Sequence, residues 1–148
     1  MNQMNNIPSS GIIENGIHHF PIRVYYEATD AVGVTYYGEY LRFAERARTE
    51  YLRLAGVCQT QLKQDENCLF VVRRVNIDYT KSSGLDDVLM VETTLKKIEG
   101  VRLFMNQILK REGTEIVSMT VEVACIKADT LRPCRVPKSV ISQLQTKP

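Results

Sequence analysis

Residues 36–56 read YYGEYLRFAERARTEYLRLAG, and the spacing within this segment sets the architecture expected for the whole chain. Apolar side chains recur at steps of three and four residues, and charged side chains fill the positions between them. That pattern predicts one long amphipathic helix, which ends at Gly56. Its apolar stripe consists of Tyr40, Ala44, Ala47, Tyr51 and Leu54, with Leu41, Arg48 and Ala55 alongside.

The chain on both sides of this helix is strand-like. Gaps that contain glycine, at residues 99–100 and 112–113, are short enough for antiparallel hairpins. A helix with a broad apolar stripe has to lie across one face of the resulting sheet, because no other long helix is expected to cover it. The sequence therefore predicts an α+β fold with about five strands. Strands are expected at 17–26, 69–79, 88–98, 101–111 and 115–128, a polar loop at 59–67 and a short second helix at 140–145.

Length and charge limit the classes of protein that need to be considered. A chain of 148 residues fits one domain, which we expect at residues 17–148, after a flexible N-terminal tail at 1–16 that is rich in Asn, Ser and Gly. The net charge of +2 gives no support for a nucleic-acid partner. Neither a secretory signal nor an apolar run of about 20 residues is present, so no membrane span is expected.

The cysteines and histidines give no metal motif. Cys58, Cys68, Cys125 and Cys134 include no C-x-x-C pair, and the chain has only two histidines. We therefore expect no metal site and four reduced thiols, which favours the cytoplasm, although disulfides stay open. His18 and His19 are adjacent at the start of the first strand, where a plain strand-edge role is expected.

Asp30 is the residue with the most chemical promise. It lies in a turn of small and polar residues, 27–34, just before the long helix. The first N–H groups of a helix have no intrahelical partner, so they can polarise a carbonyl beside a carboxylate that serves as base or nucleophile. Aspartate is also common as a turn or capping residue. The residues alone leave both interpretations open.

The sequence around Asp30 resembles a known signature. Residues 23–48, with Thr-Asp-x-x-Gly-Val at 29–34 and Glu-Arg-Ala-Arg at 45–48, are similar to the 4-hydroxybenzoyl-CoA thioesterase family, and nearest to its bacterial acyl-CoA thioesterases associated with the Tol–Pal system. The similarity spans roughly residues 18–130 and includes Phe70-Val71-Val72-Arg73, Tyr79 and Leu85-Asp86-Asp87. It implies a hotdog fold, hydrolysis of acyl-CoA thioesters without a cofactor, and homodimers or homotetramers with active sites at the subunit interface. An acyl carrier protein is a further candidate partner.

The resemblance also implies roles for individual residues. Asp30 matches the catalytic aspartate, which attacks the thioester carbonyl or activates water, and the backbone N–H of Tyr37 matches the donor that polarises this carbonyl. Gly33, Val34 and Tyr36 are expected to line the substrate site. The chain departs from many relatives at Ala28, where they have a second acid, and at Tyr37, where the Tol–Pal group tends to have histidine.

Basic residues are expected near the site, because coenzyme A has phosphates. Arg74 and Lys81 are the candidates, out of a larger set that also includes Lys96, Lys97, Arg102, Lys110 and Arg111. Arg73 falls between Val71 and Val75 on the expected apolar face of its strand, where a lone charge is costly. We expect Arg73 to pair with Glu45 on the helix, and Glu45 also lies within ion-pairing reach of Arg48.

Two other functions fit the same expected fold. A hotdog dehydratase would need a histidine beside its carboxylate, and neither His18 nor His19 is at a matching position. A non-catalytic protein that binds acyl-CoA or acyl carriers would use the same pocket, since a shared fold does not guarantee a shared activity.

Overall fold

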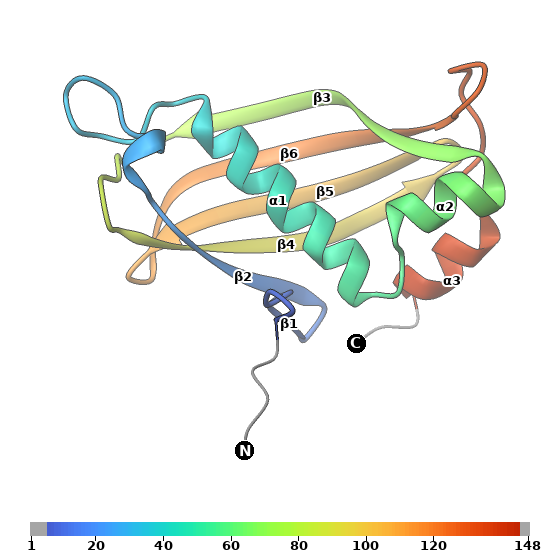
Figure 1. The fold of residues 1–148 in the computed structure, drawn as a ribbon, viewed down its shortest axis with the longest axis horizontal. Coiled ribbons are helices and arrows are strands. Elements are labelled where there is room, and N and C mark those ends of the chain that lie inside the picture. Colours follow the sequence, from blue (N-terminus) through green and yellow to red (C-terminus); the bar gives the residue numbers. More distant parts are fainter. Residues whose placement is uncertain (1–5, 146–148) are drawn as a thin grey trace.

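The structure is a computed structural model that describes residues 6–145. Its elements follow the predicted order, with one long helix between the first strands and a set of four long strands (Figure 1). The strands are β1 (Ile12–Glu14), β2 (Ile17–Arg23), β3 (Cys68–Tyr79), β4 (Val88–Glu99), β5 (Arg102–Arg111) and β6 (Thr114–Lys127); the helices are α1 (Glu39–Leu54), α2 (Gln59–Glu66) and α3 (Lys138–Gln145), with a 3-10 turn at Tyr26–Ala28.

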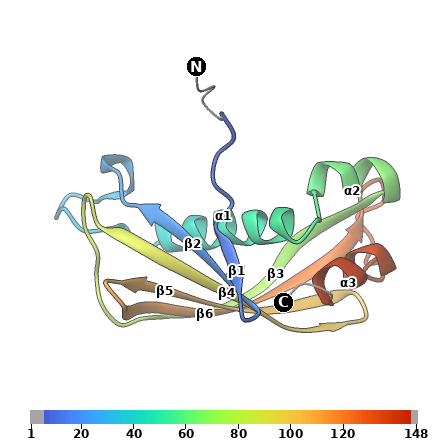
Figure 2. The same cartoon turned by 90° about the horizontal axis from the view of Figure 1, so that it is seen from below.

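All six strands form one antiparallel sheet in the order β1-β2-β4-β5-β6-β3. The expected hairpins at Gly100 and Gly113 are present, and both glycines have positive φ angles, of 63° and 80°. Consecutive strands β4, β5 and β6 are therefore neighbours, whereas β3 crosses to the far edge and pairs with β6 alone. The sheet curves around α1, which lies on its concave face (Figure 2).

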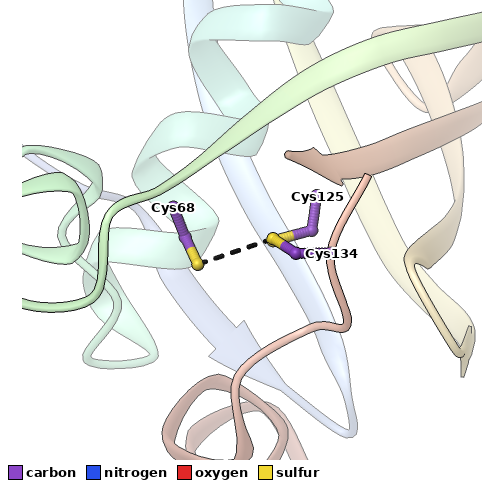
Figure 3. Close-up of side chains that lie close together, drawn as sticks. All are labelled: Cys68, Cys125 and Cys134. Carbon is purple, nitrogen blue, oxygen red and sulfur yellow. Dashed lines mark hydrogen bonds between the residues drawn. The ribbon is translucent and has the colours of Figure 1, made fainter. Parts of the chain in front are cut away.

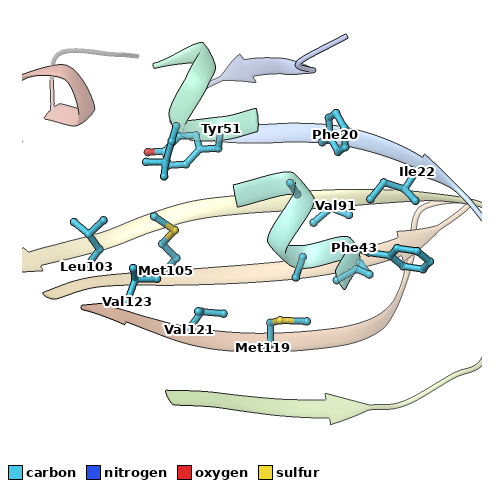
Figure 4. Packing of buried hydrophobic residues seen from close by; sticks show 14 of the residues in the cluster. Phe20, Ile22, Phe43, Tyr51, Val91, Leu103, Met105, Met119, Val121 and Val123 are labelled. Atoms are coloured by element: carbon cyan, nitrogen blue, oxygen red, sulfur yellow. The ribbon is translucent and has the colours of Figure 1, made fainter. Parts of the chain in front are cut away.

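The core lies between α1 and this concave face (Figure 4). Ala44 and Ala47 are fully buried, so their small side chains let the helix approach the strands closely. Large apolar side chains of the central strands fill the space beneath the helix, as the predicted alternation requires. They include Leu89, Val91, Leu103, Met105, Leu109, Val117, Met119, Val121 and Val123.

A buried polar network joins α1 to the central strands. Arg48 Nη1 donates to Gln107 Oε1 at 2.9 Å, and Gln107 Nε2 donates to the Ala44 carbonyl at 2.9 Å and to Thr93 Oγ1 at 3.0 Å. Burial lowers the pKa of Arg48, and the charge of Glu45 opposes that shift. Buried charges are tolerated when they are hydrogen-bonded, so this network allows Arg48 to lie on the helix face that contacts the sheet.

The sequence missed two elements. Residues 59–66 were expected in a polar loop but form α2, in which Leu62 alone is buried, so the segment has almost no apolar periodicity to detect. Residues 12–14 were expected in the flexible tail but form β1, whereas residues 1–5 of that tail lie outside the described part of the chain. Asn15 and Gly16, both with positive φ, join β1 to β2 as a two-residue hairpin turn. Asn-Gly is a known signal for such a turn.

A β-bulge in β3 changes which side chains face the helix. Val72 pairs with Val123 and Arg74 pairs with Glu122, so Arg73 is the extra residue. Because side chains alternate between the faces of a strand, the bulge reverses the phase. Val71 therefore faces away from α1, and Val72 faces toward it. The prediction that Val71 and Val75 share one apolar face, with Arg73 between them, was wrong for this reason.

His18 was predicted to be a strand-edge residue, but it is part of the core. Its ring is fully buried between Phe20 and Tyr51, with ring centroids 6.0 and 5.7 Å away. One ring nitrogen, Nε2, lies 2.6 Å from the Ser10 carbonyl oxygen, and Nδ1 has no partner among the described residues. Burial lowers the pKa of His18, so the fold favours the neutral ring.

We expect this burial to make stability depend on pH. The pKa of His18 is lower in the folded state than its ordinary value of 6.5, so the unfolded chain binds a proton first as pH falls. The contribution of His18 to the free energy of unfolding is therefore complete above about pH 6.5 and declines as pH falls through the folded pKa. Urea denaturation from about pH 8 to about pH 5 should show a shallower decline for His18→Gln than for His19→Gln. Equal pH profiles of the two variants would contradict the assignment.

The Arg48 network gives a second expectation. Gln107→Leu has a similar volume but removes the acceptor of a buried guanidinium, so it should lower the free energy of unfolding by ~2–4 kcal/mol. Urea denaturation measures this loss. The matched control is Gln64→Leu, because Gln64 is exposed on α2. A loss no larger than that of the control would show that Arg48 does not depend on Gln107.

Candidate active site

The loop between the 3-10 turn and α1 holds Asp30 at its start. The Asp30 N–H donates to the Val34 carbonyl at 2.9 Å, and the Gly33 N–H donates to the Asp30 carbonyl at 3.0 Å. The carboxylate oxygen Oδ1 accepts from the backbone N–H of Val32 at 2.9 Å and of Val34 at 3.3 Å. Gly33 has φ of 92°, a backbone conformation that glycine adopts without strain. Asp30 is therefore the turn residue that one interpretation of the sequence expected.

The other carboxylate oxygen of Asp30 is available for chemistry. Within residues 6–145, Oδ2 has no hydrogen-bond partner, and the side chain is exposed. Its position is nonetheless fixed, because two N–H groups hold Oδ1 of the same carboxylate. A turn residue of this kind presents an oriented carboxylate to solvent or to a ligand.

Buried hydroxyl groups anchor this loop to the rest of the fold. Ser83, which is 2% exposed, lies in the connection between β3 and β4. Its carbonyl accepts from the Thr35 N–H at 2.7 Å, and its hydroxyl lies 2.7 Å from Thr35 Oγ1 and 2.8 Å from the Tyr40 hydroxyl. These contacts join the Asp30 loop, the first turn of α1 and the β3–β4 connection. No sequence pattern pointed to Ser83, which is one of several polar residues in its loop.

The segment that enters α1 leaves a backbone donor free. The Tyr36 N–H donates to the Ala28 carbonyl at 2.9 Å, whereas the N–H of Tyr37 has no acceptor in the part of the chain that the structure describes. An added Cβ at Gly38 would lie 2.8 Å from the Tyr36 ring, so a larger residue there would displace this exposed ring. The free N–H of Tyr37 therefore lies immediately before the helix, as expected for a group that polarises a carbonyl.

Aromatic rings surround this donor. The ring of Tyr37 lies 4.7 Å from the ring of Tyr36 and 6.1 Å from that of Tyr79, and the ring of Tyr40 lies 5.8 Å from that of Tyr79. Tyr36, Tyr37 and Tyr79 are exposed, which places apolar surface beside a polar backbone group. A hydrogen bond between the hydroxyl groups of Tyr36 and Tyr37 raises the pKa of Tyr36.

A cavity of about 380 Å³ opens farther along α1, between its later turns and the first half of β3. Arg48, Leu52, Phe70, Val72 and Met105 contribute to its walls. In Figure 1, α1 crosses the sheet diagonally, starting beside the end of β3 and ending near β4. The cavity lies where the helix has moved away from β3, and its walls are mainly apolar.

The predicted basic residues are divided between two places. Lys81 lies in the β3–β4 connection, two residues before Ser83, and thus belongs to the same group of loops as Asp30. Arg74 pairs in register with Glu122, on the sheet face that points away from α1, so the structure does not bring it to Asp30. Arg73 and Arg102 bind the same carboxylate and hold the pKa of Glu122 below its usual range. The predicted ion pair between Arg73 and Glu45 was therefore wrong.

Three arginines that the sequence analysis passed over lie on the helix side. Arg23, Arg42 and Arg46 line a hollow of about 280 Å³ that also includes Ala28, two residues before Asp30. Arg42 and Arg46 are four residues apart on α1, a spacing that places them on one face of the helix. This spacing is visible in the sequence and could have identified Arg42 and Arg46 as a pair of basic residues on one face of the helix.

Comparison with known proteins agrees with the fold. A model of the thioesterase-like superfamily matches residues 24–144. The acyl-CoA thioesterase YbgC of Haemophilus influenzae is 43% identical over 129 residues, which are 87% of this chain and 94% of that protein. The acyl-CoA thioester hydrolase YbgC of Escherichia coli O6:H1 is 37% identical over 130 residues, which are 87% and 96% of the two chains.

Solved structures show the same architecture. A probable thioesterase from Bartonella henselae superposes with a TM-score of 0.78 at 35% identity, over 82% of this chain and 99% of that one. A DHNA-CoA thioesterase from Staphylococcus aureus superposes with a TM-score of 0.80 at 26% identity, over 87% of this chain and 91% of that one. The predicted hotdog fold is thus confirmed, with six strands instead of about five. The chain is a homologue of bacterial acyl-CoA thioesterases and belongs to the thioesterase-like superfamily.

Proposed function

We propose that this protein hydrolyses acyl-CoA thioesters to a free carboxylic acid and coenzyme A, with Asp30 and the Tyr37 backbone N–H as the groups that act on the thioester. The observation that supports this most directly is the Asp30 loop. It fixes one carboxylate oxygen by two hydrogen bonds and leaves the other free, on the segment that leads to a free N–H at Tyr37.

The reaction follows from these two groups. The thioester carbonyl oxygen accepts a hydrogen bond from the Tyr37 N–H, which stabilises the negative charge that develops on this oxygen. Asp30 Oδ2 either attacks the carbonyl carbon or removes a proton from the water that attacks it. The C–S bond then breaks, and the thiolate of coenzyme A leaves and takes up a proton. In the first route, water afterwards hydrolyses the acyl–aspartyl anhydride and regenerates the carboxylate.

The environment of the site suits an acyl-CoA. Tyr36, Tyr37 and Tyr79 offer apolar surface for an acyl or pantetheine chain, with Gly33 and Val34 at the near side of the loop. Lys81 and the arginines at 23, 42 and 46 offer positive charge for phosphates, although Glu27 and Glu39 line the same hollow and Glu39 lies 3.9 Å from Arg42. Arg74 lies opposite Glu122 on the other face of the sheet. An acyl carrier protein presents the same thioester on a similar arm, and it is the second substrate to test.

The fold leaves an edge that supports a homodimer. β3 is twelve residues long, pairs with β6 alone, and has apolar side chains at Val71 and Val72 that are 41% and 47% exposed. A long, apolar edge strand tends to pair with another strand. Antiparallel pairing of two copies through β3 would extend the sheet and would cover the open side of the cavity beside α1.

We infer a cytoplasmic setting, since a reducing compartment suits four free cysteines. No helix within residues 6–145 is long and apolar enough to cross a membrane.

Asp30→Asn is the decisive variant, because asparagine keeps an oxygen that can accept the two loop hydrogen bonds but cannot act as base or nucleophile. We expect kcat to fall by roughly 10³-fold or more, with an unchanged melting temperature. Thiol release from a panel of short, long and aromatic acyl-CoAs measures the effect. Asp65→Asn, on exposed α2, is the matched control and should retain full activity. Full turnover by Asp30→Asn would reject the mechanism, and no turnover of any substrate by the wild type would favour a binding protein.

The role of the Tyr37 backbone can be separated from that of its side chain. Tyr37→Phe keeps the N–H and should change kcat little, whereas Tyr37→Pro removes the N–H and should lower kcat by roughly 10²–10³-fold. Circular dichroism and thermal melting check that the proline variant is folded. Similar kcat values for the two variants, both folded, would exclude the Tyr37 N–H as the carbonyl donor.

The proposed dimer predicts a change in mass. Val72→Lys places a charge on the inner face of the β3 edge and should convert the dimer to a monomer in light scattering coupled to size exclusion. Ile12→Lys, at the exposed β1 edge on the other side of the sheet, should leave the dimer intact. A dimer that persists in Val72→Lys would place the interface elsewhere.

A further inference from the structure

Three of the four cysteines meet at one end of the sheet, although Cys68 lies 66 residues before Cys134 in the chain (Figure 3). Cys68 begins β3, Cys125 lies near the end of β6, and Cys134 belongs to the arm that leads from β6 to α3. The Cys134 sulfur lies 3.5 Å from that of Cys125 and 3.7 Å from that of Cys68, and all three sulfurs lie within 4.8 Å of one another. This cysteine trio plays no part in the proposed hydrolysis.

The backbone places all three side chains on the same face. Cys68 pairs in register with Lys127, two residues beyond Cys125, so Cys68 and Cys125 both point toward the concave face. The arm runs antiparallel to β6, with an isolated bridge between Ile126 and Pro133 and a hydrogen bond of 3.0 Å from the Cys134 N–H to the Cys125 carbonyl. Cys134 is thus directly opposite Cys125. Sheet register and the arm therefore fix the positions of the three sulfurs.

The distances fit a single ion at the centre. With two sides of 3.5 and 3.7 Å and a third side of at most 4.8 Å, the centre of the triangle lies at most about 2.4 Å from each sulfur. A metal–thiolate bond to a first-row ion is about 2.3 Å long. An ion at this centre would bind all three sulfurs with almost no movement of the backbone.

The donor set selects the kind of ion. Within residues 6–145, the group of clustered metal-ligating side chains contains three cysteines and neither a histidine nor a carboxylate. Structural zinc sites use four ligands in a tetrahedron, whereas thiolate sulfur is soft and favours Cu(I). We propose that Cys68, Cys125 and Cys134 form a three-coordinate binding site for a soft monovalent cation, Cu(I).

Binding is an exchange of protons for metal and needs no oxidant. Cys68 and Cys125 are buried, and a buried site tolerates neutral thiols better than thiolates. As Cu(I) binds, S–H bonds are replaced by S–Cu bonds and the protons pass to solvent. Cys68 and Cys125 are buried but Cys134 is only half-buried, so the ion enters from the side of the arm.

The test begins from Cys58→Ser, because Cys58 is exposed and would bind Cu(I) by itself. Reduced protein is titrated with Cu(I) under anaerobic conditions, in competition with a chromophoric Cu(I) chelator. We expect one equivalent of Cu(I), X-ray absorption with three sulfur neighbours at about 2.3 Å, and a higher melting temperature with metal than without. Cys58→Ser/Cys134→Ser should lose at least ten-fold in affinity, the three-sulfur signal and the gain in melting temperature.

A folding check and a second variant keep the proposal open to refutation. The metal-free double variant is first shown by circular dichroism to be folded; Cys58→Ser/Cys134→Ala is a second version of the same deletion. Equal Cu(I) affinity with and without Cys134 would overturn the proposal, as would a preference for Zn(II) over Cu(I). Absence of any Cu(I) binding by the reduced Cys58→Ser protein would show that the trio serves only as packing. Recovery from cells of a disulfide between two of the three cysteines, with no capacity for metal after reduction, would also refute it.

Discussion

A single helix of sixteen residues has to cover the concave face of a six-stranded sheet. The helix covers this face incompletely, because it crosses the strands diagonally and packs chiefly against β1, β2 and β4. Its first turn meets the end of β3, where Tyr40 contacts Tyr79, while its later turns move away from the beginning of that strand. The cavity beside α1 and the apolar edge of β3 are both consequences of this incomplete cover. A second copy of the chain is the simplest structure that would complete it.

The close approach of α1 also determines where polar groups can be buried. Alanines at 44 and 47 bring the helix so near to the sheet that the next large residue, Arg48, cannot reach solvent freely. Gln107 resolves this by accepting from the guanidinium and donating back to the carbonyl of Ala44. The same side chain therefore compensates the buried charge and fixes the position of the helix on β5. Polar side chains that lie between helix and sheet in this way specify one arrangement rather than many.

Much of this fold was predictable, because it depends on local periodicity. The long amphipathic helix and the glycine hairpins are visible within a few residues of sequence, and the structure confirms them. Within the expected apolar stripe, Tyr40, Ala44, Ala47 and Tyr51 are buried, whereas Leu41 and Leu54 are exposed. The exceptions depend on distant partners. Residues 59–66 have one buried side chain and hence almost no apolar pattern. At the bulge, Arg73 pairs with Glu122, which is 49 residues away and also pairs with Arg102 of β5. The partner of Arg73 therefore lies in β6, and the sequence of β3 alone does not reveal it.

The same distinction applies to the candidate site. The Asp30 motif is contiguous, so its loop could be found from the sequence, whereas Ser83 holds the loop across 48 residues and could not. The sequence also presented the turn role and the catalytic role of Asp30 as alternatives. A carboxylate has two oxygens, and in this loop only Oδ1 accepts hydrogen bonds from the turn. The turn role therefore supplies what the catalytic role requires, because a carboxylate that is held by one oxygen is already oriented when the other meets a substrate.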